Sequence, residues 1–302
     1  MKLLKWSPIA AAVAAGIVAG STSAYAIVGG QDATSVYPGT TAVTIVFPGL
    51  GTGHCGGALI GRRFVLTAAH CVSDQQSAPN PVPVAAANVT VRAGSNDRTS
   101  GGVVATGSRA YLHPGWMWGQ QPTGQPVSDL ALVELDRDIP GVALLPIATR
   151  PAGAGQPVRE IGWGLTTYPP APGATIPTTL KQRDVTELAA DSCTAGAITT
   201  GESCLGGGAC LGDSGSPALH HDHGWPWQHS GWDQVGIASR ETSQQQPCGP
   251  PTIYTNPGYP PFLRWIVATM RQHHTPACAC LPLLSGRPQQ QAMTMLKLTD
   301  LQ

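Results

Sequence analysis

Short runs rich in β-branched residues, separated by turn residues, are the feature that most limits the fold of this chain. The runs cover residues 41–46, 58–60, 64–66, 89–91, 130–135, 158–163, 180–188 and 234–238. Clusters of Gly, Pro, Ser and Asn lie between them, in a sequence with 37 Gly and 28 Pro. Short strands at such spacing are typical of a β-barrel or sandwich. The pattern therefore predicts an all-β protein.

A few stretches depart from the strand pattern. Residues 261–272 are predicted to form a helix, because their apolar residues recur at helical spacing. These apolar residues are Phe262, Trp265, Ile266 and Met270. Residues 77–87 and 168–177 are rich in Pro and Gly and are predicted to be loops. The last stretch, residues 273–302, contains a Cys-Ala-Cys and a run of Gln, so we expect a flexible tail there.

The N-terminus has the pattern of a secretory signal peptide. Lys2 and Lys5 are followed by an apolar run over residues 9–20 and by Ala-Tyr-Ala at residues 24–26, a small-residue cleavage site. A membrane anchor is the alternative, but it would need about 20 apolar residues. We therefore expect residues 1–26 to be removed and the mature protein to be secreted. In that oxidising environment the eight cysteines are expected to form disulfides rather than a metal site.

Composition excludes some classes of partner. The chain has 17 basic and 17 acidic residues and a formal net charge of zero. Nucleic acids and anionic membranes attract basic proteins, so neither is expected as a partner. Hydrophobic residues make up 42% of the chain, which is enough for a packed core.

Three short motifs carry residues suited to nucleophilic and acid–base chemistry. His70 lies in Thr-Ala-Ala-His-Cys, Asp129 opens an apolar strand, and Ser214 lies in Gly-Asp-Ser-Gly. An acidic group that enters a buried strand needs a partner for its charge. Flanking glycines allow a tight turn whose N–H groups point at a substrate oxygen. Each motif alone has a plain structural reading, as a core histidine, a strand cap or a polar turn. The order His, Asp, Ser is more specific than any one of them.

Taken together, these motifs resemble those of the chymotrypsin/trypsin family of serine peptidases, and the chain is similar to secreted bacterial members. The matching stretches are residues 27–30 (Ile-Val-Gly-Gly), 67–71, 129–132, 162–164 (Gly-Trp-Gly), 212–215 and the helix around Trp265. The likeness covers about residues 27–272. It implies two six-stranded antiparallel β-barrels with a C-terminal helix. The first barrel would span about residues 27–145 and the second about 146–260, with the active site between them.

The resemblance also implies a role for each matching residue. Ser214 would attack the scissile carbonyl, His70 would accept its proton, and Asp129 would hold the imidazole in the correct tautomer. The N–H groups of Gly212 and Ser214 would form the oxyanion hole, worth about 3–4 kcal/mol per donor in other enzymes. Ser239 matches the serine that supports the buried aspartate, although an ordinary strand-end serine is its alternative reading. The partners would be protein or peptide substrates and protein inhibitors, and the protein would be a monomer.

Three disulfides follow from the same resemblance: Cys55–Cys71, Cys193–Cys204 and Cys210–Cys248. The first would staple the loop that carries His70, and the last would brace the wall of the specificity pocket. Each bridge would be worth about 2–4 kcal/mol. Cys278 and Cys280 are left over. They can pair with each other, bridge to another chain or stay as free thiols.

Activation in this family depends on a new N-terminal amine, which folds inward and pairs with the aspartate before the catalytic serine. In this sequence the two partners would be Ile27 and Asp213. The expected signal cleavage falls directly before Ile27. We therefore predict that signal cleavage itself produces the active N-terminus without a further activation peptide. Cleavage a few residues earlier, followed by trimming, is the alternative.

The specificity pocket departs from that of a trypsin. The floor position, six residues before Ser214, is Gly208, so the acid that would pair with a basic substrate side chain is absent. The wall positions match Glu241 and Thr252, and Arg240 replaces the tryptophan of the family. These residues favour small or medium uncharged side chains before the scissile bond, the P1 position. A preference for Arg or Lys, bound through Glu241, is the second interpretation. Glu241 itself has the alternative of being a solvated loop residue.

Four histidines and three tryptophans lie close together in one Gly- and Pro-containing stretch: His220, His221, His223, Trp225, Trp227, His229 and Trp232. A metal site is conceivable there, but the resemblance places the stretch in a hairpin loop after the catalytic serine. Residues 95–98 are too poor in carboxylates for the calcium loop of the family. We therefore predict no metal and no cofactor.

Two other functions use the same fold. A catalytically silent binding protein would have lost a residue of the triad or the oxyanion hole, and this chain retains all of them. An esterase would use the same acyl-enzyme chemistry on another substrate.

Overall fold

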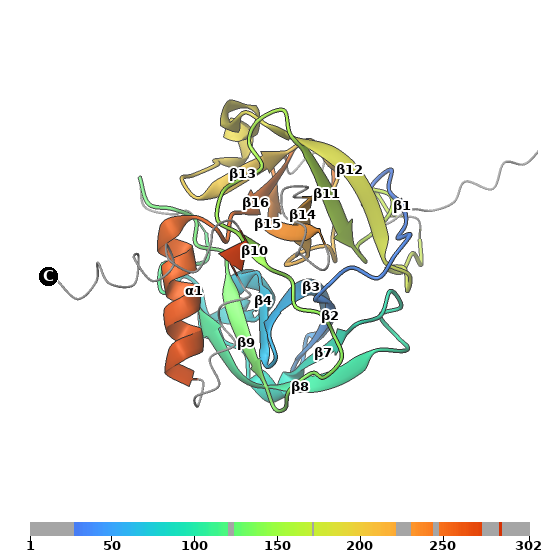
Figure 1. Ribbon diagram of the computed structural model, residues 1–302, viewed down its shortest axis with the longest axis vertical. Helices are drawn as coiled ribbons and strands as arrows, with labels where there is room; N and C mark the ends of the chain where they lie inside the picture. The colour runs from blue at the N-terminus through green and yellow to red at the C-terminus, as the bar shows by residue number, and fades with distance from the viewer. Residues whose placement is uncertain are drawn as a thin grey trace, which may run out of the picture.

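The computed structural model describes residues 27–119, 124–170, 172–221, 231–243, 248–273 and 284–285. Figure 1 shows two β-barrels, one above the other, with helix α1 (Pro260–His273) along one side. The fold class predicted from the sequence is thereby confirmed. Across the described ranges, no helix combines the length and the apolar character that crossing a bilayer requires. The predicted signal peptide lies outside these ranges.

The first barrel closes from six strands that pair in the order β2, β3, β4, β9, β8, β7. In chain order they are β2 (Thr40–Phe47), β3 (Gly51–Gly61), β4 (Phe64–Thr67), β7 (Val89–Ala93), β8 (Val103–Leu112) and β9 (Ala131–Leu135). Strand β7 shows how the sequence builds this barrel. Val89, Val91 and Ala93 are fully buried whereas Thr90 is exposed, because successive side chains point to opposite faces.

The second barrel closes because β14 pairs with both β11 and β15. Its strands are β11 (Pro157–Gly162), β12 (Lys181–Leu188), β13 (Glu202–Leu205), β14 (Pro217–His221), β15 (Trp232–Glu241) and β16 (Thr252–Thr255). The register of β15 against β16 shifts between Ala238 and Arg240. Such bulges redirect a side chain, and the residue at this one is Ser239.

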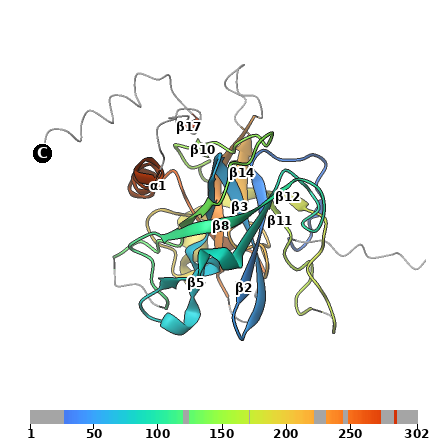
Figure 2. The ribbon, with the colours of Figure 1, turned by 90° about the horizontal axis from the view of Figure 1, so that it is seen from below.

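The two ends of the described chain each pack on the barrel that is remote from them in sequence. Strand β1 (Gln31–Asp32) pairs with β12, so the first residues after position 27 lie on the second barrel. Helix α1 buries Phe262, Ile266 and Met270 against the cluster that contains the first-barrel core. Figure 2 shows α1 almost end-on beside the barrels. The N-terminal segment therefore differs from the predicted first-barrel range of 27–145.

Besides β1, the described residues form four further two-residue strands outside the barrels. Strands β5 (Ser73–Asp74) and β6 (Val82–Pro83) pair with each other at the predicted loop 77–87. Strand β10 (Ile147–Ala148) pairs in parallel with β15, and β17 (Leu284–Ser285) pairs with β10. Of the predicted tail, the structure thus describes His273 at the end of α1 and the two residues of β17.

Candidate active site

His70 lies in a tight turn directly after the first-barrel strand β4. That strand ends at Thr67, and a single 3-10 turn over Ala69–Cys71 carries the histidine. A disulfide joins Cys71 to Cys55 of β3, so the turn is tied covalently to the neighbouring strand. The His70 side chain keeps 23% of its surface exposed, which leaves the ring accessible to a substrate.

Asp129 lies two residues before β9 and is buried beside the histidine ring. Its Oδ2 atom is 2.8 Å from Nδ1 of His70, and its Oδ1 atom accepts the backbone N–H of His70 at 2.9 Å. The hydroxyl of Ser239 donates to Oδ2 at 2.7 Å. The carboxylate is 2% exposed, so these bonds replace its hydration. Asp129 therefore fixes both the ring and the backbone of His70.

The charges of this pair shift the pKa values of both groups. Burial lowers the pKa of His70, but the charge and the hydrogen bond of Asp129, helped by the charge of Glu241, outweigh burial and raise it above 6.5. Burial raises the pKa of Asp129, yet His70 and the Ser239 hydroxyl outweigh this effect and lower it below 3.8. The geometry thus favours an imidazole that binds a proton beside an ionised carboxylate.

Ser214 lies in a turn between two glycines with positive φ, at 98° for Gly212 and 76° for Gly215. Such backbone suits glycine because it has no Cβ. The N–H groups of Asp213, Gly215 and Ser216 donate to backbone carbonyls. In the part of the chain that the structure describes, the N–H groups of Gly212 and Ser214 donate to no acceptor. Both are therefore available to an oxygen of a ligand.

The serine turn packs closely on the first barrel. The N–H of Gly56 in β3 donates to the Ser214 carbonyl at 2.7 Å. A Cβ at Gly215 would lie 2.3 Å from Oγ1 of Thr67, so the turn touches the end of β4. Among the described residues, no hydrogen bond joins the Ser214 hydroxyl to the His70 ring. Catalytic hydrogen bonds of this kind are often long until a substrate binds.

Ile27 and Asp213, the predicted activation pair, lie together behind the serine turn. Ile27 is fully buried, and its backbone N–H interacts with the Asp213 carboxylate. Asp213 also accepts the N–H groups of Gly164 at 2.7 Å and Cys210 at 2.9 Å. Burial raises the pKa of Asp213 to about 7, although these backbone donors lower it. A positive charge at Ile27 would favour the ionised form.

The predicted specificity pocket is a small hollow beside Ser214. Its volume is about 20 Å³, and Glu241 and Thr252 are among its lining residues. This volume is close to that of one water-sized probe. Thr252 is held in place because its hydroxyl donates to the Gly207 carbonyl at 3.3 Å. Gly208, the predicted floor, is not among the described residues that line this hollow.

Arg240 also lines this hollow, and its guanidinium is held by a partner that the sequence pattern did not indicate. Its guanidinium pairs with the buried side chain of Glu202 and donates to the carbonyls of Gly196 and Ala197 at 3.0 Å each. Glu202 also accepts the N–H and the hydroxyl of Thr199, at 2.7 and 2.8 Å. The two charged residues lie far apart in the sequence, so no local motif joins them. Arg240 is therefore occupied within the protein.

The other predicted cysteine pairs are also bonded in the structure, as Cys193–Cys204 and Cys210–Cys248. The sulfur atoms of Cys55 and Cys71 lie near the His70 ring, but a disulfide does not offer the thiolates that bind metals. Cys278 and Cys280 lie outside the described residues.

The stretch rich in histidine and tryptophan is described in part. His220 and His221 end β14, and Trp232 begins β15, as expected for a hairpin. His223, Trp225, Trp227 and His229 lie outside the described residues.

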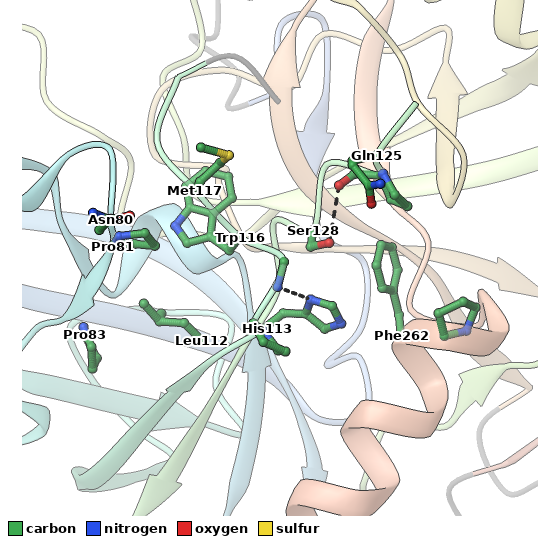
Figure 3. Close-up of a pocket in the computed structure, with 14 residues that line it drawn as sticks. Asn80, Pro81, Pro83, Leu112, His113, Trp116, Met117, Gln125, Ser128 and Phe262 are labelled. Atoms are coloured by element: carbon green, nitrogen blue, oxygen red, sulfur yellow. Dashed lines mark hydrogen bonds between the residues drawn. The ribbon is translucent and has the colours of Figure 1, made fainter. Parts of the chain in front are cut away.

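A larger cavity of about 720 Å³ lies on the first-barrel side of the site. Figure 3 shows His113 and Trp116 on its walls, with Phe262 of α1 beside them. Burial lowers the pKa of His113 to about 4, and its Nδ1 accepts the N–H of Gly115 at 3.1 Å. None of the predicted site residues is among those that line this cavity. This cavity is therefore separate from the residues that the sequence motifs indicate.

The comparisons with known proteins point to one family. Residues 27–266 match the family model described as Trypsin. Serine protease SP24D of Anopheles gambiae is 32% identical over 227 residues, which cover 72% of this chain and 73% of that protein. Human Kallikrein-7 is 32% identical over 233 residues, 73% of this chain and 79% of its own length. Trypsin alpha of Drosophila melanogaster is 28% identical over 63% of this chain and 68% of its own length.

Proposed function

Because the chain belongs to the trypsin family and is a serine endopeptidase, we propose that His70, Asp129 and Ser214 form its catalytic triad. The observation that carries this proposal is the His70 ring held at 2.8 Å by a buried aspartate, beside a serine turn with two unused N–H groups. The family's substrates are proteins or peptides, and protein inhibitors and a monomeric state belong to the proposal.

In this mechanism the Ser214 hydroxyl attacks the scissile carbonyl while Nε2 of His70 accepts its proton. Asp129 keeps Nδ1 protonated, so Nε2 is the nitrogen that can act as base. The imidazolium that forms is stabilised by the Asp129 carboxylate, and it later protonates the leaving amine. Water then releases the acyl group from Ser214 by the same route in reverse.

The oxygen of the tetrahedral intermediate would bind the free N–H groups of Gly212 and Ser214. These donors are fixed before the reaction, because the residues around them use their own N–H groups within the protein. A donor of this kind is worth about 3–4 kcal/mol in the transition state. Ser239 would support the charge of Asp129 through its 2.7 Å hydrogen bond.

For the substrate, we propose small or medium uncharged side chains at P1. The hollow beside Ser214 has a volume of about 20 Å³, and Thr252, whose hydroxyl donates to the Gly207 carbonyl, is one of its lining residues. Arg or Lys remains the second candidate because Glu241 lines the hollow and its charge acts on His70. Long basic side chains would require Thr252 to move.

Secretion and activation are proposed from the sequence. Residues 1–26 would be a signal peptide, residues 27–272 the peptidase domain, and residues 273–302 a flexible tail. Cleavage before Ile27 would create an ammonium group next to Asp213 and so favour its charged form. The relatives reported above come from insects and human, so the likeness to bacterial members stays a prediction. N-terminal sequencing of the secreted protein tests the cleavage site; an active protein that begins elsewhere would contradict it.

A serine-directed phosphonate tests the triad directly. We expect it to label the wild-type protein at Ser214 and to leave Ser214→Ala unlabelled. A catalytically silent homologue would bind substrates without being labelled, and labelling at another serine would refute the assignment. A peptide library with varied P1 then separates the substrate candidates. Preference for Ala or Val supports the small pocket, and preference for Arg or Lys that is lost in Glu241→Gln supports the second candidate.

A further inference from the structure

A buried glutamate lies directly beneath the backbone of the specificity pocket. Glu160 of β11 is 0% exposed. A Cβ at Gly207 would lie 1.8 Å from its Oε2 and 2.1 Å from its Oε1, so the carboxyl group fills the space that a side chain at 207 would occupy. The Gly207 carbonyl accepts the Thr252 hydroxyl, and the adjacent Gly208 carbonyl accepts the N–H of Val28 at 2.9 Å. Glu160 thus supports the backbone that joins the pocket wall to the N-terminal segment.

Charged and titratable groups face Glu160 from each neighbouring element. Arg183 lies opposite it on β12, Tyr254 comes from β16, and Asp213 comes from the serine turn, while its β14 neighbour is the uncharged Ala218. Among the described residues, neither carboxyl oxygen makes a hydrogen bond of ordinary geometry. Burial, followed by the charge of Asp213, raises the pKa of Glu160 to about 8, although Arg183, Tyr254 and the Gly208 N–H lower it.

We propose that Glu160 is a positioning residue of this reaction, which holds the 207–213 backbone in place as a neutral, protonated acid. The proposal rests on the proposed function, in which Asp213 must be ionised to hold the Ile27 amine. When two carboxylates share a buried site, the charge on one raises the free energy of ionising the other. The Arg183 guanidinium, the nearby cation, already donates to the Val28 carbonyl. Neutral Glu160 is therefore the form that the packing accommodates.

Ionisation of Glu160 would place a second negative charge against Asp213 and under Gly207. Burial outweighs the groups that favour the charged form, so a charge at Glu160 is strongly unfavourable and the backbone around it must move to admit water. The same backbone leads to the oxyanion donors Gly212 and Ser214. Activity should therefore fall on the alkaline side as Glu160 loses its proton.

The test compares pH profiles of kcat/KM for the wild-type chain, Glu160→Gln and Glu187→Gln, from about pH 6 to about pH 10. Gln keeps the shape of Glu160 but cannot ionise. Glu187 is the matched control, because it is a buried glutamate of the same barrel whose carboxylate accepts the Gly153 N–H at 2.9 Å. We expect Glu160→Gln to move the alkaline limb up by about one pH unit, which is about tenfold in relative activity at the upper end. The acid limb of Glu160→Gln and both limbs of Glu187→Gln should stay in place.

Two results would overturn the proposal. An alkaline limb that is unmoved in Glu160→Gln shows that its proton is irrelevant to the reaction. An alkaline limb that moves to lower pH in Glu160→Gln shows that the carboxylate supports the amine of Ile27 instead. A wild-type chain without activity at any pH would overturn the proposed function as well, whereas an active enzyme with an unmoved limb overturns this proposal alone.

A second measurement does not require catalysis. In Ser214→Ala protein, urea unfolding is compared with and without Glu160→Gln across the same pH range. Because the folded-state pKa of Glu160 is raised to about 8 from 4.5, its stabilising contribution is complete below the lower value and is lost as pH rises through the upper one. Ser214→Ala should therefore lose stability relative to the double variant between about pH 6 and about pH 8, by about 1.4 kcal/mol per pH unit, and change little above that. A difference that does not change with pH would overturn the proposal.

Discussion

The two barrels share a strand count but bury different kinds of side chain. The first barrel buries large apolar residues such as Phe64, Leu66 and Leu132. The separate core cluster of the second barrel is built mostly from small residues: Ala148, Val158, Val185, Leu205, Ala209, Ala218, Val235, Ala238 and Tyr254. Around these small residues the second barrel buries polar groups, among them Glu160, Gln182, Asp213 and Gln234.

This difference separates two tasks. The first barrel acts as an apolar platform, and it presents His70 and Asp129 at the ends of β4 and β9. The second barrel carries the serine turn and the pocket, whose backbone is held by buried polar contacts such as those of Asp213. Buried polar groups cost stability unless they are bonded. We infer that changes in the first core affect folding and that changes in the second affect the reaction and its pH dependence.

The largest effect on the reaction rate is expected at Asp129, the first-barrel residue that holds the His70 ring. Asp129→Asn should lower kcat by about 10⁴-fold, because the amide no longer selects the right tautomer of His70. The negative charge that raises the pKa of His70 is lost too, so the acid limb of kcat/KM should move to lower pH. Stopped-flow and steady-state rates across pH measure kcat and the position of the acid limb. Near wild-type kcat in this variant would contradict the role of Asp129.

The second effect compares the two cores directly. Phe64→Ala should destabilise the protein by about 3–5 kcal/mol, because Phe64 is fully buried in the first core. Val158→Ala in the second core removes two methyl groups and should cost about 2 kcal/mol. Urea unfolding monitored by circular dichroism gives both values. Equal losses would remove the distinction between an apolar platform and a small-residue core.

The third and smallest effect concerns the bond that crosses between the barrels. Ser239→Ala removes the donor at 2.7 Å from Asp129, a bond to a charged group worth about 1.5–3 kcal/mol. We expect kcat/KM to fall about tenfold, with a smaller change in unfolding free energy than Phe64→Ala. Ser203→Ala, at another buried serine of the second barrel, is the control. An unchanged kcat/KM in Ser239→Ala would contradict a supporting role.

Much of the fold was predictable from the sequence because several strands alternate clearly, as β7 does with Val89 and Val91 inward and Thr90 outward. Four of the barrel strands were not predicted: β8, β13, β14 and β16. In β8, Gly107 and Ser108 interrupt the pattern where the register shifts. In the other three, consecutive residues are buried, so no period of two is visible.

The predicted site residues lay in local motifs, and in the structure Asp129 contacts both His70 and Ser239. Glu160 was missed although a signal exists: it follows the core residue Val158 by two positions and so shares its inward face. The side chain of a glutamate in a strand is usually predicted to point toward solvent. The pair of Arg240 with Glu202 left no signal, since it depends on how β13 and β15 meet in space.

The central claim is that Ser214 and His70 act as one unit, and a double-variant cycle tests it most directly. The measurement is kcat/KM of wild type, Ser214→Ala, His70→Ala and the double variant on one peptide substrate. Residues of such a unit are strongly non-additive. We predict that the double variant is no slower than either single variant. Losses that multiply in the double variant would show that the two residues act independently and would contradict the account.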